Sequence, residues 1–253
     1  MKTTVLFILC LMLYGIAFGQ KKNIDEVKVT PPKFIGVTNA ISVIKDGKAE
    51  SIDDYLARNI EYPEKDRKSF NQGTEVVQFT VTPNGELKEY IIINSVSPLI
   101  DDEVIRALET TNGMWIPGYN NDEPFVMETE VSVVFKVNGN RFDQDFLTLG
   151  TKHFTKGSEM LLTQNNPKKA MKSYDKGIKL LPNDESLLLM RGFARYGAGN
   201  FDGAMRDWER IIYLGGTFSD EYLTNLSGLE GYAELLNVLK KNPETDDLLI
   251  TKQ

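Results

Sequence analysis

The sequence predicts an α+β domain, a small antiparallel sheet with helices on one face, followed by an all-α domain. Apolar residues that alternate with polar ones mark three strands around one helix between residues 31 and 138. A self-similarity with a period of 34 residues marks the helical part between residues 151 and 242. The length of 253 residues is enough for two modest domains.

The first domain opens with an extended segment and a short helix. The pair Pro31-Pro32 favours extended backbone. Ser51 is a suitable helix N-cap with an acidic residue three positions on. We therefore expect a helix over residues 51–60, which Pro63 stops soon afterwards. Its buried face would be formed by apolar residues at helical spacing, namely Ile52, Tyr55, Leu56 and Ile60.

Residues 74–82 and 87–94 predict a β-hairpin. In the first segment Val77, Phe79 and Val81 alternate with polar residues, which is typical of a strand with one buried face. The pair Asn84-Gly85 between the segments accepts the positive φ angles of a tight turn. The second segment is therefore expected to return antiparallel to the first.

A helix and a third strand complete the β-β-α-β order. Ser97-Pro98 favours a helix start, because serine caps the first turn and proline suits the first helical position. The acidic run that follows lies near the positive end of the helix dipole. The last strand is expected at residues 126–137, with Val131, Val133, Phe135 and Val137 facing the core.

Trp115 stands between the predicted helix and the last strand, in the segment Trp115-Ile116-Pro117-Gly118. An exposed tryptophan here would act in recognition. We expect instead that it fills the core under the sheet, with Pro117-Gly118 making the turn beyond it.

This ordered set of segments resembles the C-terminal domain of TonB, the periplasmic protein that energises outer-membrane receptors. The segments are YP at 62–63, GTEVVQFTV at 73–81, PNGEL at 83–87, SVSPLIDDEVIRAL at 95–108, MWIPG at 114–118 and EVSVVF at 130–135. The resemblance covers residues 62–135. It implies a domain that captures a short extended motif of a partner such as an outer-membrane receptor.

A small open sheet has an edge strand with unpaired backbone groups, and a partner segment can bind there as an added strand. We expect the last strand to supply this edge. The predicted partner-binding residues are Thr129, Val131, Val133 and Phe135. The same edge would allow two copies of the chain to exchange strands in a homodimer.

The 34-residue period of the second domain pairs small residues with small ones and aromatic residues with aromatic ones. The matched pairs are Phe154–Leu188, Ser158–Gly192, Ala170–Ala204, Tyr174–Trp208 and Gly177–Ile211. The pattern resembles the tetratricopeptide repeat (TPR), a helix-turn-helix unit. It departs from that repeat at Gly216, where a proline is usual, and at Arg191, where a leucine is usual. Residues 218–241 are expected to be helical, as a degenerate third unit or a cap.

The TPR resemblance implies that a peptide or protein binds on the concave side of the first helices. The residues expected there are Lys152, Thr155, Glu159, Ser186, Leu189 and Phe193. The alternative is a structural appendage that packs on the first domain and binds nothing.

Residues 1–19 have the form of a cleaved signal peptide: Lys2, an apolar run from Val5 to Phe18, and a small-residue end. The run has 14 residues, fewer than the roughly 20 that span a bilayer. The alternative is an uncleaved inner-membrane anchor. Residues 20–30 and 139–150 are expected to be linkers, and residues 243–253 a flexible tail.

The composition argues against several kinds of chemistry. The net charge is −7 and no basic run occurs, which disfavours binding to nucleic acid or to a membrane surface. The one cysteine lies in the predicted signal peptide, and His153 is the one histidine. We therefore expect no catalytic residues, no metal site and no cofactor.

The sequence thus predicts an exported periplasmic protein, not an enzyme, with one interaction module for strand addition and a second, helical one. The alternative is a TonB-type energy transducer for outer-membrane transport, anchored by an uncleaved N-terminus. About ten residues separate the predicted signal from the first domain, and fully extended they reach about 35 Å. That is short for an arm that crosses the periplasm.

Overall fold

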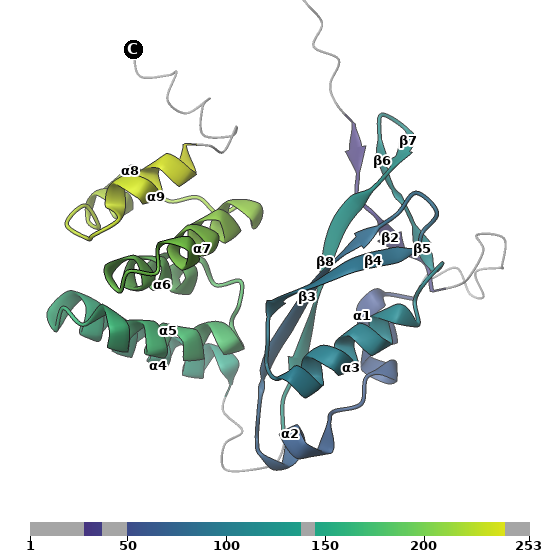
Figure 1. Cartoon of the computed structure of the whole chain (residues 1–253), viewed down its shortest axis with the longest axis horizontal. Coiled ribbons are helices and arrows are strands. Elements are labelled where there is room, and N and C mark those ends of the chain that lie inside the picture. The colour runs from purple at the N-terminus through teal and green to yellow at the C-terminus, as the bar shows by residue number, and fades with distance from the viewer. Residues whose placement is uncertain (1–27, 37–49, 138–144, 241–253) are drawn as a thin grey trace, which may run out of the picture.

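The computed structural model describes residues 28–36, 50–137 and 145–240. The predicted signal peptide, most of the predicted linker at 20–30 and the predicted tail lie outside these residues. The described chain has an α+β part and a helical part, as the sequence predicts. Figure 1 shows the helical part on one side of the central sheet and helices α1 and α3 on the other.

The central sheet has three antiparallel strands in the order β4-β3-β8. Their bounds are Gly73–Val81 for β3, Leu87–Asn94 for β4 and Met127–Phe135 for β8. The expected turn joins β3 to β4, with Gly85 at a φ of +76°. The predicted hairpin and last strand are therefore confirmed, with β3 as the middle strand.

Helices α1 (Ile52–Asn59) and α3 (Pro98–Glu109) cover one face of the sheet, and the short α2 (Glu64–Lys68) precedes β3. Both predicted N-caps form: Ser51 Oγ accepts from the backbone of Asp54, and Ser97 Oγ accepts from the backbone of Ile100. The core between sheet and helices contains fully buried residues from both layers, among them Val77, Phe79, Ile100, Val104 and Leu108.

Five short strands surround this unit. They are β1 (Val29–Thr30), β2 (Lys33–Phe34), β5 (Trp115–Ile116), β6 (Gly118–Asn120) and β7 (Glu123–Phe125). Strand β1 pairs with β6, so the ordered domain begins before the expected residue 31. Trp115 is 7% exposed and its Nε1 donates to Thr111 Oγ1 over 3.0 Å, which confirms its core position.

The C-terminal region is helical, and asparagine residues cap two of its helices. Its elements are α4 (Phe146–Ser158), a π-helical extension η2 (Glu159–Thr163), α5 (Pro167–Leu180), α6 (Glu185–Gly197), α7 (Phe201–Tyr213), α8 (Asp220–Thr224) and α9 (Tyr232–Leu239). Asn166 caps α5 and Asn200 caps α7 through their side-chain oxygens. Helix α4 begins inside the expected linker at 139–150, and residues 218–241 hold two short helices.

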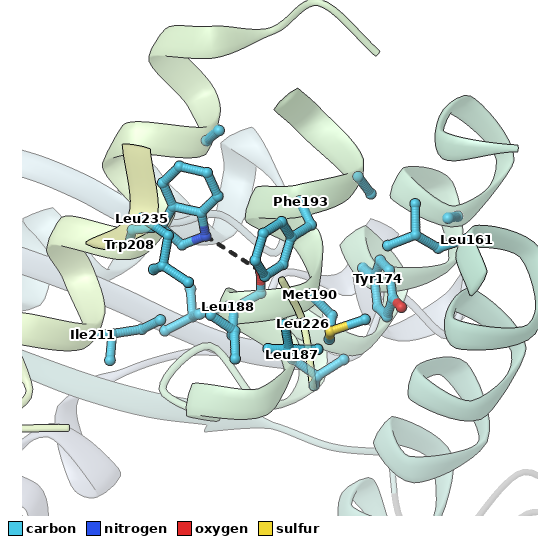
Figure 2. Close-up of a cluster of buried hydrophobic side chains, with 14 of the residues drawn as sticks. Leu161, Tyr174, Leu187, Leu188, Met190, Phe193, Trp208, Ile211, Leu226 and Leu235 are labelled. Carbon is cyan, nitrogen blue, oxygen red and sulfur yellow. Dashed lines mark hydrogen bonds between the residues drawn. The ribbon is translucent and has the colours of Figure 1, made fainter. Parts of the chain in front are cut away.

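Small residues in this region lie against large aromatic ones. A Cβ at Gly192 would lie 2.1 Å from Trp208 Nε1, and a Cβ at Gly157 would lie 2.6 Å from the Tyr174 ring. Both aromatic side chains are fully buried. Figure 2 shows Trp208 beside Phe193, with its Nε1 donating to the Leu189 carbonyl over 3.3 Å. Any side chain at Gly192 would force α6 away from α7.

The end of α5 packs closely on the start of β3, so the two parts of the chain share an interface. A Cβ at Gly73 would lie 2.6 Å from the Lys179 carbonyl oxygen. Thr74 Oγ1 donates to the Leu180 carbonyl over 2.7 Å. Val76, whose side chain points away from the α1–α3 core, is also fully buried. At this end the helical region therefore covers the face of the sheet that α1 and α3 leave free.

Glu75 is a fully buried carboxylate on β3. Its Oε2 accepts from the backbone of Val96 over 2.7 Å, and its Oε1 has no hydrogen-bond partner among the described residues. The pKa of Glu75 is raised to about 8, chiefly by burial and in part by the nearby Asp101, although the Val96 N–H and Lys179 oppose this. The folded protein therefore retains a proton at Glu75 near neutral pH that the unfolded chain releases.

We expect Glu75→Gln to remove a pH-dependent loss of stability. The pKa of Glu75 is higher in the folded protein than in the unfolded chain. Its contribution to the free energy of unfolding is therefore complete below about pH 4.5 and declines as the pH rises towards 8. Relative to wild type, the variant should gain roughly 2 kcal/mol of unfolding free energy between pH 5 and pH 8.5. Urea unfolding at several pH values measures this difference. The exposed Glu123→Gln is the control, and an equal gain there would contradict the assignment.

Candidate partner-binding surfaces

Strand β8 is an edge of the sheet, since within the described residues it pairs with β3 alone in that sheet. Its register with β3 runs unbroken over nine residue pairs, from Gly73 opposite Phe135 to Val81 opposite Met127. Three of its residues on the far face of the sheet, Glu128, Ser132 and Val134, are exposed. The edge is thus long and regular, which is the form that a further strand can join.

The side chains expected at this edge point into the core. Val131 and Phe135 are 4% and 3% exposed, and Thr129 and Val133 are half-buried. The four predicted residues therefore do not present side chains to a partner. The reason is geometric, because the apolar pattern of this strand marks the face that packs on α1 and α3.

Two hydrogen bonds show which backbone groups of β8 face outwards. The Thr74 backbone carbonyl accepts a hydrogen bond from the Asn94 side chain of β4, so the backbone N–H and C=O of Thr74 point towards β4. The backbone groups of the residues next to Thr74 in β3 therefore point towards β8. The backbone N–H of Val137, just beyond β8, donates to Gln72, on the β3 side. Because backbone direction alternates along a strand, the N–H and C=O groups of the odd-numbered residues of β8 point towards β3. The residues of β8 whose backbone groups point away from β3 are called the outward set: Glu128, Glu130, Ser132 and Val134.

Strand β4 is the opposite edge, and it is irregular. Its register with β3 shifts between Val76 and Val77 and again between Gln78 and Thr80. Glu89, beside the second shift, has a φ of +55°. Bulges of this kind bend an edge strand and disturb its row of backbone groups. A long added strand therefore fits β8 better than β4.

The residues expected on the concave helical face divide into two groups. Lys152, Thr155, Glu159 and Ser186 are exposed. Ser186 lines a hollow of about 190 Å³ together with Thr151 and Phe154. Leu189 and Phe193 are 0% and 2% exposed and belong to the helical core, so this expectation is corrected for both. In α6 they lie on the side that packs against the neighbouring helices.

A network of arginines and aspartates lies on the side of α6 and α7 that faces the sheet. Asp207 is 3% exposed and accepts two hydrogen bonds from Arg191, at 2.7 and 3.0 Å, and one from Arg195 at 2.7 Å. Burial raises the pKa of Asp207, although the two arginines oppose this. One buried carboxylate thus holds two guanidinium groups in place.

A second ion pair joins the helical region to the sheet. Arg210 of α7 donates to both carboxylate oxygens of Glu130 on β8, over 2.7 and 2.8 Å. Its guanidinium also lies 4.8 Å from the centre of the Tyr213 ring. The pair is largely buried, with side-chain exposures of 12% and 19%. It positions the helical region over the outer face of the sheet.

Residues 58–137 match the family described as the Gram-negative bacterial TonB protein C-terminal. The match starts in α1 and ends just beyond β8. This segment is similar to a TonB C-terminal domain. No curated protein and no solved structure matches the chain.

TonB C-terminal domains bind proteins, such as outer-membrane receptors, and are not enzymes. In the part of the chain that the structure describes, no three His, Cys, Asp or Glu side chains gather as metal ligands would. Across the described ranges, no helix combines the length and the apolar character needed to cross a bilayer. The assignment of the helical region to the tetratricopeptide repeats stays a prediction.

Sequence reasoning missed both the outward set on β8 and the arginine network. The strand pattern itself indicated the outward set, since the residues between the core-facing ones carry the backbone groups that point outwards. For the arginine network the signal was local composition, because four of the eight arginines of the chain fall within residues 191–210. That local enrichment was a usable signal in an acidic sequence.

We expect Asp207→Asn to destabilise the protein by roughly 3 kcal/mol, because it leaves two partly buried guanidinium groups without their shared carboxylate. Chemical denaturation of the wild type and variant measures the loss. Glu209→Gln, an exposed change on the same helix, should stay within about 0.5 kcal/mol of wild type. If the two variants lose the same stability, Asp207 does not organise the network.

Proposed function

We propose that this chain is an exported periplasmic protein-interaction protein that binds an extended segment of a partner by strand addition to β8. The observation that supports this best is the unbroken register of β8 with β3 beside an edge that no strand occupies within the described residues. The match to the TonB C-terminal family supports a role in binding proteins. Export rests on the form of residues 1–19.

The outward set offers the hydrogen bonds that such a partner needs. Four residues at alternate positions carry one N–H and one C=O each. Each bond contributes about 1 kcal/mol net, so backbone pairing alone gives a modest affinity. The added strand would place alternate side chains beside the exposed Ser132 and Val134, the latter 61% exposed. Selectivity would arise from these neighbours.

The helical region forms a second module in this proposal. Lys152, Thr155, Glu159 and Ser186 are exposed on it and remain the proposed contact residues of the TPR-like face. Two linked modules raise the affinity for a partner that engages both, through effective concentration.

The strand-addition proposal predicts that Ser132→Pro abolishes partner capture without unfolding the domain. Proline removes the outward N–H of this residue but no bond to β3. We expect at least tenfold weaker binding of a partner identified from Gram-negative envelope extracts, measured with the purified partner by titration calorimetry. Circular dichroism and the melting temperature should stay near the wild-type values.

Ser132→Ala is the matched control, because it removes the same hydroxyl group and keeps the N–H. It should bind like wild type. If Ser132→Pro is folded and binds normally, β8 is not the binding edge. If both variants lose binding equally, the side chain and not the backbone is responsible.

A TonB-type energy transducer is the second candidate, and the family match favours considering it. Transmission of force requires that residues 1–19 stay attached as an anchor. We expect N-terminal sequencing of the exported protein to begin at Gln20, as signal cleavage predicts. An intact Met1 in an inner-membrane fraction would support the transducer instead.

A further inference from the structure

A cleft of about 590 Å³ lies between the outer face of the sheet and helices α6 and α7. Volumes of about 300 to 1,000 Å³ are usual for ligand sites. The cleft is separate from the β8 edge, since its strand wall is β4 and part of β3. The Arg210–Glu130 pair lies on the side of the cleft that is towards β8.

The strand wall of the cleft is apolar and runs along an edge. Five consecutive residues, Ile91 to Ser95, line it. Ile91 and Ile93 are 50% and 37% exposed, which is unusual for two neighbouring isoleucines of one strand. Ile92 stands opposite Val77, a core residue, so it is the backbone of Ile92 that borders the cleft. The wall thus offers both apolar surface and main-chain groups.

The helical wall is rich in guanidinium groups. Arg191, Arg195, Arg206 and Arg210 all line the cleft, together with two carboxylates, Asp207 and Glu209. Glu130 balances Arg210, and Asp207 is shared by Arg191 and Arg195. Arg206 is exposed and makes no hydrogen bond or ion pair with the described residues.

Arg206 carries the positive charge of this wall that no carboxylate of the described residues contacts. Asp175 also pairs with Arg191 and Arg195, over 3.2 and 3.7 Å, so the other three guanidinium groups all have carboxylate partners. Burial lowers the pKa of Arg195; the nearby Arg191 and Arg206 lower it further, while Asp207 and Asp175 oppose them. Arg206 is therefore held near two other guanidinium groups, and an anion that contacts Arg206 would relieve this repulsion.

We propose that this cleft binds an extended peptide whose acidic side chains lie at Arg206 and whose apolar side chains pack on Ile91 and Ile93. A peptide fits better than a small anion for two reasons. A small anion would leave the isoleucines in water. The five residues of the strand wall span about 16 Å, the length of a short extended segment. The site does not depend on strand addition at β8.

The test uses the purified protein and a fluorescein-labelled peptide of sequence Gly-Leu-Asp-Ile-Asp-Leu-Gly. Fluorescence anisotropy should show saturable binding that weakens as salt is raised, because ion pairs at an open cleft are screened. A peptide with asparagine at both aspartate positions should bind at least tenfold more weakly. A peptide with serine at the apolar positions should also lose binding.

Two variants locate the binding in the cleft. Arg206→Gln and Ile91→Thr should each weaken the probe about tenfold. Arg67→Gln, an exposed arginine on α2, is the control and should change nothing. Because Arg206 and Ile91 are exposed, neither change should unfold the protein, and melting temperatures verify this.

The outcomes separate this proposal from the function proposed above. Ser132→Pro should leave probe binding unchanged, and Arg206→Gln should leave capture at β8 unchanged. The cleft proposal fails if the probe does not bind, if Arg206→Gln binds it normally, or if inorganic phosphate displaces it while the serine peptide binds equally well. The last result would indicate a site for small anions.

Discussion

The structure depends on the burial of β3. This strand pairs on both sides, with β4 and with β8, and its two faces contact different layers. The side chains of Val77 and Phe79 pack on the core under α1 and α3, whereas Val76 and Thr74 face the helical region. Because eight of its nine residues are buried, a change in β3 affects the sheet, the TonB-type core and the domain interface together. Gly73 permits this arrangement, since it lets the end of α5 approach the strand.

Much of this fold could be predicted because its local signals agree with one another. The strand alternation, the Asn-Gly turn and the caps at Ser51 and Ser97 each specify a local conformation, and the tertiary structure keeps all of them. The helical region gave equally local signals, such as the Asn166 and Asn200 caps at the inter-helix turns. The Trp115 position also followed from the sequence, since a single large aromatic residue beside a turn is usually buried.

The candidate sites were less predictable, because they depend on how distant segments meet. An apolar pattern identifies the buried face of β8, so it pointed to Val131 and Phe135 as partner-binding residues. The residues between them carry the backbone groups that a partner strand could bind. The same ambiguity led to Leu189 and Phe193, which resemble surface positions of a repeat but lie in the core. The cleft could not be foreseen at all. It is formed by β4 and by helices about one hundred residues later, and only their packing brings isoleucines opposite arginines.

Glu130 takes part in two structures at once. Its backbone belongs to the outward edge of β8, and its side chain is held by two hydrogen bonds from Arg210. A load applied along β8 would therefore reach α7 directly, without passing through the residues that join β8 to α4. A single carboxylate thus makes the sheet and the helical region mechanically one unit at this point.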